Sequence, residues 1–88
     1  MSAYVYTLNL QSGNKYVGYT ENLNKRLSQH FSGNGAQWTQ KHTPVSINSI
    51  QKVSSVAYAK KLETIIYYKM KEYHGGSKVR GAGNTKSY

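Results

Sequence analysis

Two alternating segments joined by a short turn constrain the fold of this chain more than any other feature of its sequence. The residues from Tyr4 to Leu10 alternate in the manner of a β-strand, and Lys15 to Thr20 predicts a second strand rich in aromatic and β-branched residues. The residues between them, Gln11 to Asn14, are typical of a turn. The first twenty residues are therefore predicted to form an antiparallel hairpin. Within the second strand, Gly18 predicts either a bend or the close approach of another group.

A helix is expected directly after the hairpin. Asn22 is a suitable N-cap, and Leu23, Leu27 and Phe31 recur at helical spacing up to about Ser32. Arg26 and His30 fall one turn apart on the flank of this apolar stripe, where a side chain lies beside a core and still reaches solvent. An arginine there offers a permanent positive fork for phosphate oxygens, and a histidine can transfer a proton near neutral pH. The alternative is a surface helix of a basic protein.

The remaining elements complete an α+β fold. Residues 36–42 predict one or two helical turns that bury Trp38, and Val45 to Val53 predicts a third strand with a bulge at Asn48-Ser49. A second main helix is expected from a Ser54 or Ser55 cap to Tyr73. The predicted fold is a three-stranded antiparallel sheet with two main helices in the order β-β-α-β-α. Residues 1–88 form one domain, and residues 75–88 form a glycine-rich basic segment that is either a disordered terminus or a clamp on a phosphate backbone.

The second main helix carries one of only three carboxylates in the chain. Its predicted buried stripe consists of Ala59, Leu62, Ile66, Met70 and Tyr73. Glu63 lies at the edge of that stripe, which predicts a half-buried carboxylate. The alternative is an exposed Glu63 in an ion pair with Lys60.

Charge and composition restrict the function. Twelve Lys and Arg against three Glu and no Asp give a formal charge of +9, which favours a polyanion such as DNA or RNA as the partner. The absence of cysteine excludes disulfides and zinc-thiolate sites, and three carboxylates are too few for a multi-carboxylate metal cage. The nine tyrosines are consistent with core residues, stacking platforms for bases or reactive phenols.

Targeting features are absent from the sequence. No apolar run approaches the roughly 20 residues of a membrane span, and Met1-Ser2-Ala3 does not begin a secretion signal. The expectation is an intracellular protein, cytoplasmic or nuclear, with no membrane partner.

Several short segments, taken in order, resemble the GIY-YIG nuclease superfamily, and the resemblance extends over nearly the whole chain. Tyr4-Val5-Tyr6 stands where the family has Gly-Ile-Tyr, and Tyr16-Val17-Gly18 stands where it has Tyr-Ile-Gly. The further matches, in chain order, are Arg26, His30, the loop from Gly33 to Pro44, the helix segment from Ala59 to Glu63, and Val79-Arg80-Gly81. The loop is similar to that of small stand-alone members, and the last segment is similar to one in viral and mobile-element members. Tyr4 replaces the glycine of the first motif, and Tyr19-Thr20 stands where many members have a lysine.

The resemblance implies a metal-dependent DNA endonuclease that hydrolyses phosphodiester bonds with a single divalent metal. Glu63 would hold that metal, Mg²⁺ or Mn²⁺, and Arg26 would neutralise the charge of the transition state. Either Tyr6 or Tyr16 would be the general base, with its pKa lowered by the metal, Arg26 and a lysine, Lys15 or Lys25. His30 would relay the proton or position the water.

The same resemblance, with the basic composition, predicts contacts with DNA and leaves other functions open. The candidate nucleic-acid-binding residues are Lys15, Lys25, Lys41, Lys78, Arg80 and Asn84. A second copy of the chain or a targeting partner would supply specificity. The alternatives are a catalytically weak or inactive member that binds nucleic acid, and a small basic structural protein, which would leave the motif spacing unexplained.

Overall fold

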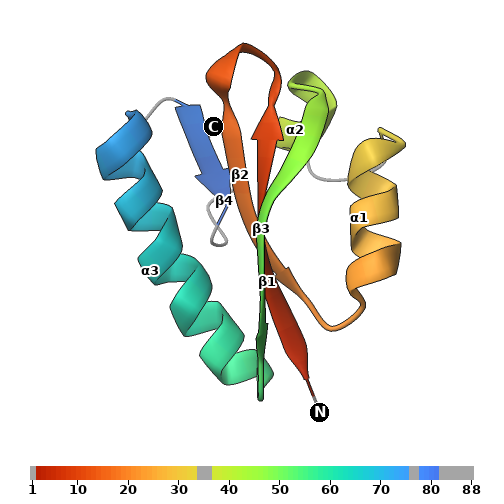
Figure 1. The fold of residues 1–88 in the computed structure, drawn as a ribbon, viewed down its shortest axis with the longest axis vertical. Helices are drawn as coiled ribbons and strands as arrows, with labels where there is room; N and C mark the ends of the chain where they lie inside the picture. The colour runs from red at the N-terminus through yellow and green to blue at the C-terminus, as the bar shows by residue number, and fades with distance from the viewer. Residues whose placement is uncertain (1, 34–36, 76–77, 82–88) are drawn as a thin grey trace.

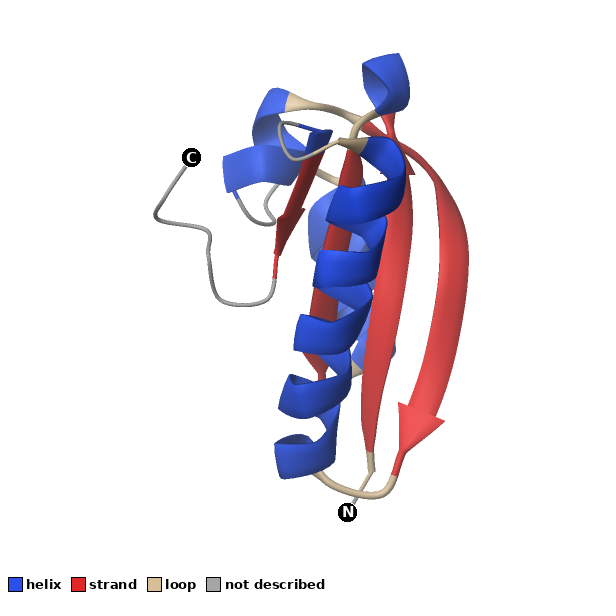
Figure 2. Ribbon diagram, turned by 90° about the vertical axis from the view of Figure 1, so that its left-hand side faces the viewer, coloured by secondary structure: helices blue, strands red, loops and turns tan. Residues whose placement is uncertain are grey.

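The computed structural model describes residues 2–33, 37–75 and 78–81. Its elements, in chain order, are β1 (Ala3–Leu10), the 3-10 turn η1 (Gln11–Gly13), β2 (Lys15–Thr20), α1 (Leu23–Phe31), α2 (Gln37–Lys41), β3 (Pro44–Val53), α3 (Val56–His74) and β4 (Val79–Gly81). The strands form one sheet in the order β3-β1-β2-β4. The sheet lies between α1 on one side and α3 on the other (Figure 1), and α3 runs along the sheet when it is viewed from that side (Figure 2).

The predicted hairpin and its turn are confirmed. β1 pairs with β2 in antiparallel register, with Tyr6 opposite Gly18 and Leu8 opposite Tyr16. The turn needs left-handed backbone, which Ser12 and Gly13 adopt at φ 62° and 75°. Because partners across a ladder share a face, Tyr6, Leu8, Tyr16 and Gly18 all face α1.

Both predicted helix starts are confirmed by their caps. The Asn22 side chain accepts a hydrogen bond from the Lys25 backbone N–H at 3.2 Å, and the Ser55 hydroxyl accepts one from the Tyr58 N–H at 3.1 Å. Each cap satisfies one of the donors that a helix N-terminus leaves without a partner. The short helix α2 is also confirmed, and it buries Trp38 to 5% exposure.

The predicted bulge at Asn48 is confirmed as well. Thr7 pairs with Ser49 whereas Leu8 pairs with Ile47, so Asn48 is the extra residue on β3. Its side chain donates to the Thr7 hydroxyl at 3.1 Å. The bulge keeps Ile47 and Ile50 on one face of β3 although they are separated by three positions in the sequence.

The predicted sheet is wrong in one respect, because it has four strands and is not purely antiparallel. Val79 to Gly81 forms β4, which pairs in parallel with Lys15 to Val17 of β2. Val79 is completely buried, and a Cβ on Gly81 would overlap the carbonyl oxygen of Val17, so only glycine fits there. This part of the 75–88 segment is therefore ordered strand, while residues 76–77 and 82–88 lie outside the described residues.

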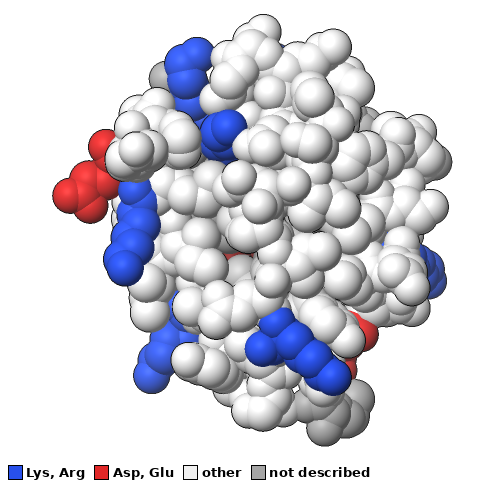
Figure 3. Space-filling view, viewed as in Figure 1, with Lys and Arg blue, Asp and Glu red and all other residues white. Residues whose placement is uncertain are grey.

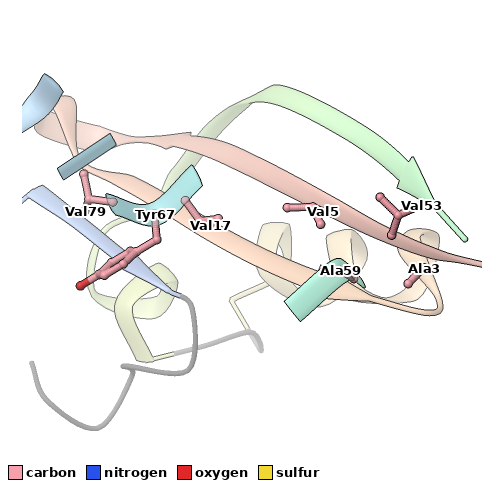
Figure 4. Close-up of a cluster of buried hydrophobic side chains, with 7 residues drawn as sticks. All are labelled: Ala3, Val5, Val17, Val53, Ala59, Tyr67 and Val79. Carbon is pink, nitrogen blue, oxygen red and sulfur yellow. The ribbon is translucent and has the colours of Figure 1, made fainter. Parts of the chain in front are cut away.

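The two faces of the sheet carry separate cores. The face covered by α3 buries Ala3, Val5, Val17, Val53, Ala59, Tyr67 and Val79 (Figure 4). The face covered by α1 and α2 buries Tyr6, Leu8, Leu10, Tyr16 and Trp38, with Leu23 and Leu27 packed against them. The second core holds hydroxyl and imidazole groups as well as hydrocarbon. In the part of the chain that the structure describes, no helix combines the length and the apolar character that a membrane crossing requires.

Candidate active site

A buried chain of hydrogen bonds lies on the α1 face of the sheet. The Tyr6 hydroxyl and His30 Nε2 are 2.8 Å apart, and His30 Nδ1 is 2.9 Å from the Thr39 hydroxyl. The three side chains come from β1, α1 and α2, and each is at most 2% exposed. Both ring nitrogens of His30 are therefore occupied, which fixes the plane of the imidazole.

Burial sets the protonation of this chain. It raises the pKa of the Tyr6 phenol well above its ordinary value, and the neighbouring Tyr16 adds to the shift, whereas the charge of Arg26 and a hydrogen bond from it act in the opposite direction. Burial, followed by the charge of Arg26, lowers the pKa of His30 to about 4. At neutral pH the pair is a phenol and a neutral imidazole. If Arg26 donates to the phenol oxygen, the phenol proton is left for Nε2, and the Nδ1 proton is left for Thr39.

The buried imidazole should make stability depend on pH. In the unfolded chain His30 takes up a proton near the ordinary histidine pKa of 6.5, whereas in the folded protein it does so only near 4. Neutral His30 therefore contributes fully to the free energy of unfolding above about pH 6.5. As the pH falls toward 4 this contribution is lost, which lowers the free energy of unfolding by about 3 kcal/mol. Urea unfolding of the wild type and of His30→Gln at pH 7 and pH 4 measures it. The glutamine variant should lose less stability than the wild type, and equal losses would contradict the lowered pKa.

Gly18 allows the two tyrosines to pack over β2. A Cβ at this position would lie 2.6 Å from the Tyr6 hydroxyl and 3.0 Å from the Tyr16 ring. The prediction that Gly18 permits a close approach is confirmed. The ring centroids of Tyr6 and Tyr16 are 6.3 Å apart, and that of His30 lies 5.6 Å from Tyr6 and 5.0 Å from Tyr16. The three rings form one cluster, with the Tyr6 hydroxyl above β2.

Arg26 lies one helical turn before His30 and reaches the same cluster. Its side chain is half-buried, and its Nη1 donates to Gln29 Oε1 at 3.0 Å. Its charge and hydrogen bond both lower the pKa of Tyr6, so the guanidinium lies close to the phenol oxygen. A fixed positive charge therefore stands beside a proton-carrying pair.

Glu63 lies on α3, which packs against the opposite face of the sheet from the ring cluster. It is 6% exposed and lies between Ala59 and Tyr67 at the centre of the buried ridge of α3, so the predictions of a half-buried or an exposed Glu63 are both wrong. Tyr73, predicted to be buried, is 86% exposed. The negative charge of Glu63 raises the pKa of Tyr6, which places the carboxylate within electrostatic range of the phenol.

The donor set restricts any metal at this site. Among residues 2–33, 37–75 and 78–81, no group of three or more His, Cys, Asp and Glu side chains could hold an ion. Zinc sites usually have three or four protein ligands, whereas Mg²⁺ is commonly held by one or two carboxylates and keeps several waters. A single carboxylate such as Glu63 is a type of ligand that Mg²⁺ or a similar hard cation accepts, with water filling the other coordination positions.

The candidate nucleic-acid contacts are dispersed. Lys15 Nζ donates to Asn9 Oδ1 at 2.7 Å on the face opposite the tyrosines, and Lys78 Nζ donates to the Ser12 carbonyl at 3.2 Å. The Arg80 guanidinium lies 4.8 Å from the Trp38 ring centroid, beside Tyr16 in the ladder. Lys25 and Lys41 are exposed on α1 and α2, and Asn84 lies outside the described residues. Of these, Arg80 is the one that the ladder places directly opposite Tyr16.

The sequence did not single out Thr39 as part of the site. It follows Trp38, and the indole N–H of Trp38 donates to the Lys15 carbonyl at 3.0 Å, which fixes α2 against β2. Thr39 is then held over His30 by an element of only five residues. A threonine in so short an element carries no pattern from which this contact could be predicted.

The structure is an α+β domain with a cluster of two tyrosines and a histidine, an arginine one turn before that histidine, and a buried carboxylate on the last helix. The family model for the GIY-YIG catalytic domain matches residues 2–75. The chain therefore belongs to the GIY-YIG family, a family of nuclease domains. β4 lies outside the matched residues.

Relatives with similar sequences are UPF0213 proteins. One from Streptococcus pneumoniae serotype 4 is 36% identical over 64 residues, which is 73% of this chain and 65% of that protein. One from Halobacterium salinarum is 32% identical over 60 residues, covering 68% of this chain and 78% of the relative. The chain thus spans slightly less than two thirds of the streptococcal relative. The solution NMR structure of a UPF0213 protein from Bacillus halodurans has a TM-score of 0.50 and 30% identity, and the match covers 83% of this chain and 81% of that one.

Proposed function

We propose that the protein is a metal-dependent endonuclease that hydrolyses phosphodiester bonds in DNA. The observation that carries the proposal is the hydrogen bond between the Tyr6 hydroxyl and His30 Nε2 beside Arg26, within electrostatic range of Glu63. A base, a proton acceptor, a fixed cation and a carboxylate are groups that can promote in-line attack of water on a phosphodiester.

Tyr6 is the proposed general base. Because its pKa is raised, a free phenolate does not form at neutral pH, so Tyr6 must lose its own proton as it takes one from the attacking water. Neutral His30 can accept that proton at Nε2, 2.8 Å away, and Thr39 holds the ring in place through Nδ1. Tyr16, whose ring packs against both, would keep this pair in position.

Arg26 and Glu63 stabilise the charges in the proposed reaction. The Arg26 guanidinium beside Tyr6 would bind a non-bridging oxygen as the phosphorus becomes five-coordinate. Glu63 would hold a Mg²⁺ or Mn²⁺ ion, which supplies Lewis-acid stabilisation of the leaving oxygen. Arg80, stacked on Trp38 near Tyr16, would contact the DNA backbone.

One observation favours a second candidate function. The raised pKa of Tyr6 would make general-base catalysis slow if bound metal did not offset it, and the protein would then bind nucleic acid with little cleavage. Net charge alone supports such binding.

Arg26→Ala separates cleavage from binding. Incubated with supercoiled plasmid and Mg²⁺ or Mn²⁺, this variant should nick DNA about 10²- to 10³-fold more slowly than the wild type, the usual effect of removing one donor to transition-state charge. DNA affinity, measured by fluorescence anisotropy, should fall much less, because one phosphate contact is only part of a larger basic surface.

Lys52→Ala is the matched control, because it removes one charge from exposed β3, where Lys52 pairs with Tyr4 and not with a member of the ring cluster. It should nick at close to the wild-type rate. Binding by the wild type without nicking in either metal would favour the second function. Parallel losses of cleavage and affinity in Arg26→Ala would contradict the role given to Arg26.

A further inference from the structure

The outer face of α3 carries large apolar side chains in a position where a surface helix is usually polar. Tyr58 is 50% exposed, Ile65 47% and Tyr68 59%. At 100° per residue, these three fall within about 80° of one another around the helix, roughly opposite Glu63. Lys61 and Lys69 are exposed and fall within the same stripe. We call these five residues the α3 surface.

The positive charge of this surface favours a polyanion as its partner. Lys60, Lys61 and Lys69 are exposed on α3, and Glu72 near the end of the helix is its only exposed carboxylate. Basic side chains follow the margin of the molecule where α3 lies, with an acidic group near the upper end (Figure 3). A second copy of this chain, also charged +9, would bring like charges together, whereas a polyanion would be attracted.

The exposed aromatic side chains favour a single-stranded nucleic acid over a duplex. Tyr68 packs edge to face against buried Tyr67, with ring centroids 5.2 Å apart, so its ring is held in place on the surface. Tyr58 lies in the first turn of α3, whose start is fixed by the Ser55 cap, and its side chain is half exposed. Unpaired bases stack on such rings, whereas the bases of a duplex are already stacked within it.

We propose that the α3 surface binds single-stranded DNA, with bases stacked on Tyr58 and Tyr68 and phosphates paired with Lys61 and Lys69. Ten residues of helix separate the two tyrosines by about 15 Å, which is the length of roughly four nucleotides at 3.4 Å each. The choice of DNA rests on the proposed function.

The surface lies on the opposite side of the sheet from the Tyr6–His30 pair. A strand bound there leaves the candidate active site open to a duplex. The substrate class that fits both surfaces is DNA with a single-stranded arm.

Binding without cleavage tests the inference. A fluorescein-labelled oligothymidylate of about twelve nucleotides is titrated in EDTA, so that the result does not depend on nuclease activity. Tyr58→Ala/Tyr68→Ala should bind at least about tenfold more weakly, because each stacked base contributes substantially to affinity, with little change in salt dependence. Lys61→Ala/Lys69→Ala should lower the slope of log affinity against log salt by about 1.4. Tyr73→Ala is the matched control, because Tyr73 is 86% exposed but lies outside the stripe, and this variant should bind like the wild type.

Affinity of the double tyrosine variant within twofold of the wild type would overturn the inference. A dimer in sedimentation velocity that this variant breaks would also overturn it, by assigning the surface to a second copy. If the protein does not nick plasmid but the oligonucleotide binds as expected, only the proposed nuclease activity is contradicted. If the protein nicks plasmid but the double tyrosine variant binds the oligonucleotide as the wild type does, only the role proposed for the α3 surface is contradicted.

Discussion

Glu63→Gln should reduce plasmid nicking by about a thousandfold or more. The amide keeps the shape of the buried side chain but loses the negative charge that would attract the cation. A metal ion typically contributes several kcal/mol to such a transition state, and each 1.36 kcal/mol is a factor of ten in rate. Initial rates of nicking at saturating Mg²⁺ and Mn²⁺ measure the loss, and calorimetric titration with Mn²⁺ measures the lost binding independently of activity.

Glu72→Gln is the matched control, since Glu72 is an exposed carboxylate on the same helix. It should leave both nicking and Mn²⁺ binding almost unchanged. The thermal midpoint of Glu63→Gln is measured on the same preparation, so that a loss of nicking is not mistaken for a loss of folded protein. Nicking that survives Glu63→Gln would rule out the proposed site.

Tyr6→Phe should lower the rate of nicking by about 10²- to 10⁴-fold, the range that general acid–base groups usually contribute. The phenylalanine ring still packs over Gly18, so the change removes only the hydroxyl that bonds His30. The cost in stability should be about 1–3 kcal/mol, because the buried Nε2 of His30 loses its hydrogen-bond partner. Single-turnover nicking and urea unfolding of the same preparation separate the two effects.

Tyr16→Phe is the natural comparison, because the sequence left the base open between the two tyrosines. Tyr16 packs against both Tyr6 and His30, and its phenylalanine variant preserves those ring contacts. It should lose less activity than Tyr6→Phe. The reverse order would transfer the role of general base to Tyr16.

Local physics explains which parts of the fold were predictable. The hairpin, both helix caps and the Asn48 bulge follow from alternation, capping side chains and turn residues within short windows of sequence. β4 does not, because its three residues are held by pairing with β2 and by the burial of Val79 under α3, both of which are long-range contacts. A strand of only three residues has no local sequence pattern from which such contacts could be predicted.

The buried ridge of α3 shows where pattern reasoning fails. Apolar spacing favoured a buried stripe of Ala59, Leu62, Ile66, Met70 and Tyr73. Ala59 is buried as predicted, but the other most buried positions are Glu63 and Tyr67. A carboxylate at the centre of a buried ridge contradicts the rule that acids lie outside, and such contradictions are expected at functional sites. The position of Glu63 was therefore mispredicted by the same feature that makes it a candidate ligand.

The central claim is that Glu63, Tyr6 and Arg26 act on a single phosphate. Crystals grown with Mn²⁺ and a short DNA carrying a non-hydrolysable linkage would test it through the anomalous scattering of manganese. We expect a peak within about 2–2.5 Å of a Glu63 oxygen, a distance typical of carboxylate ligands, with a DNA phosphate between it and the Tyr6 hydroxyl. Manganese bound elsewhere, or a phosphate backbone that passes the Tyr6–His30 pair without reaching Glu63, would contradict the claim.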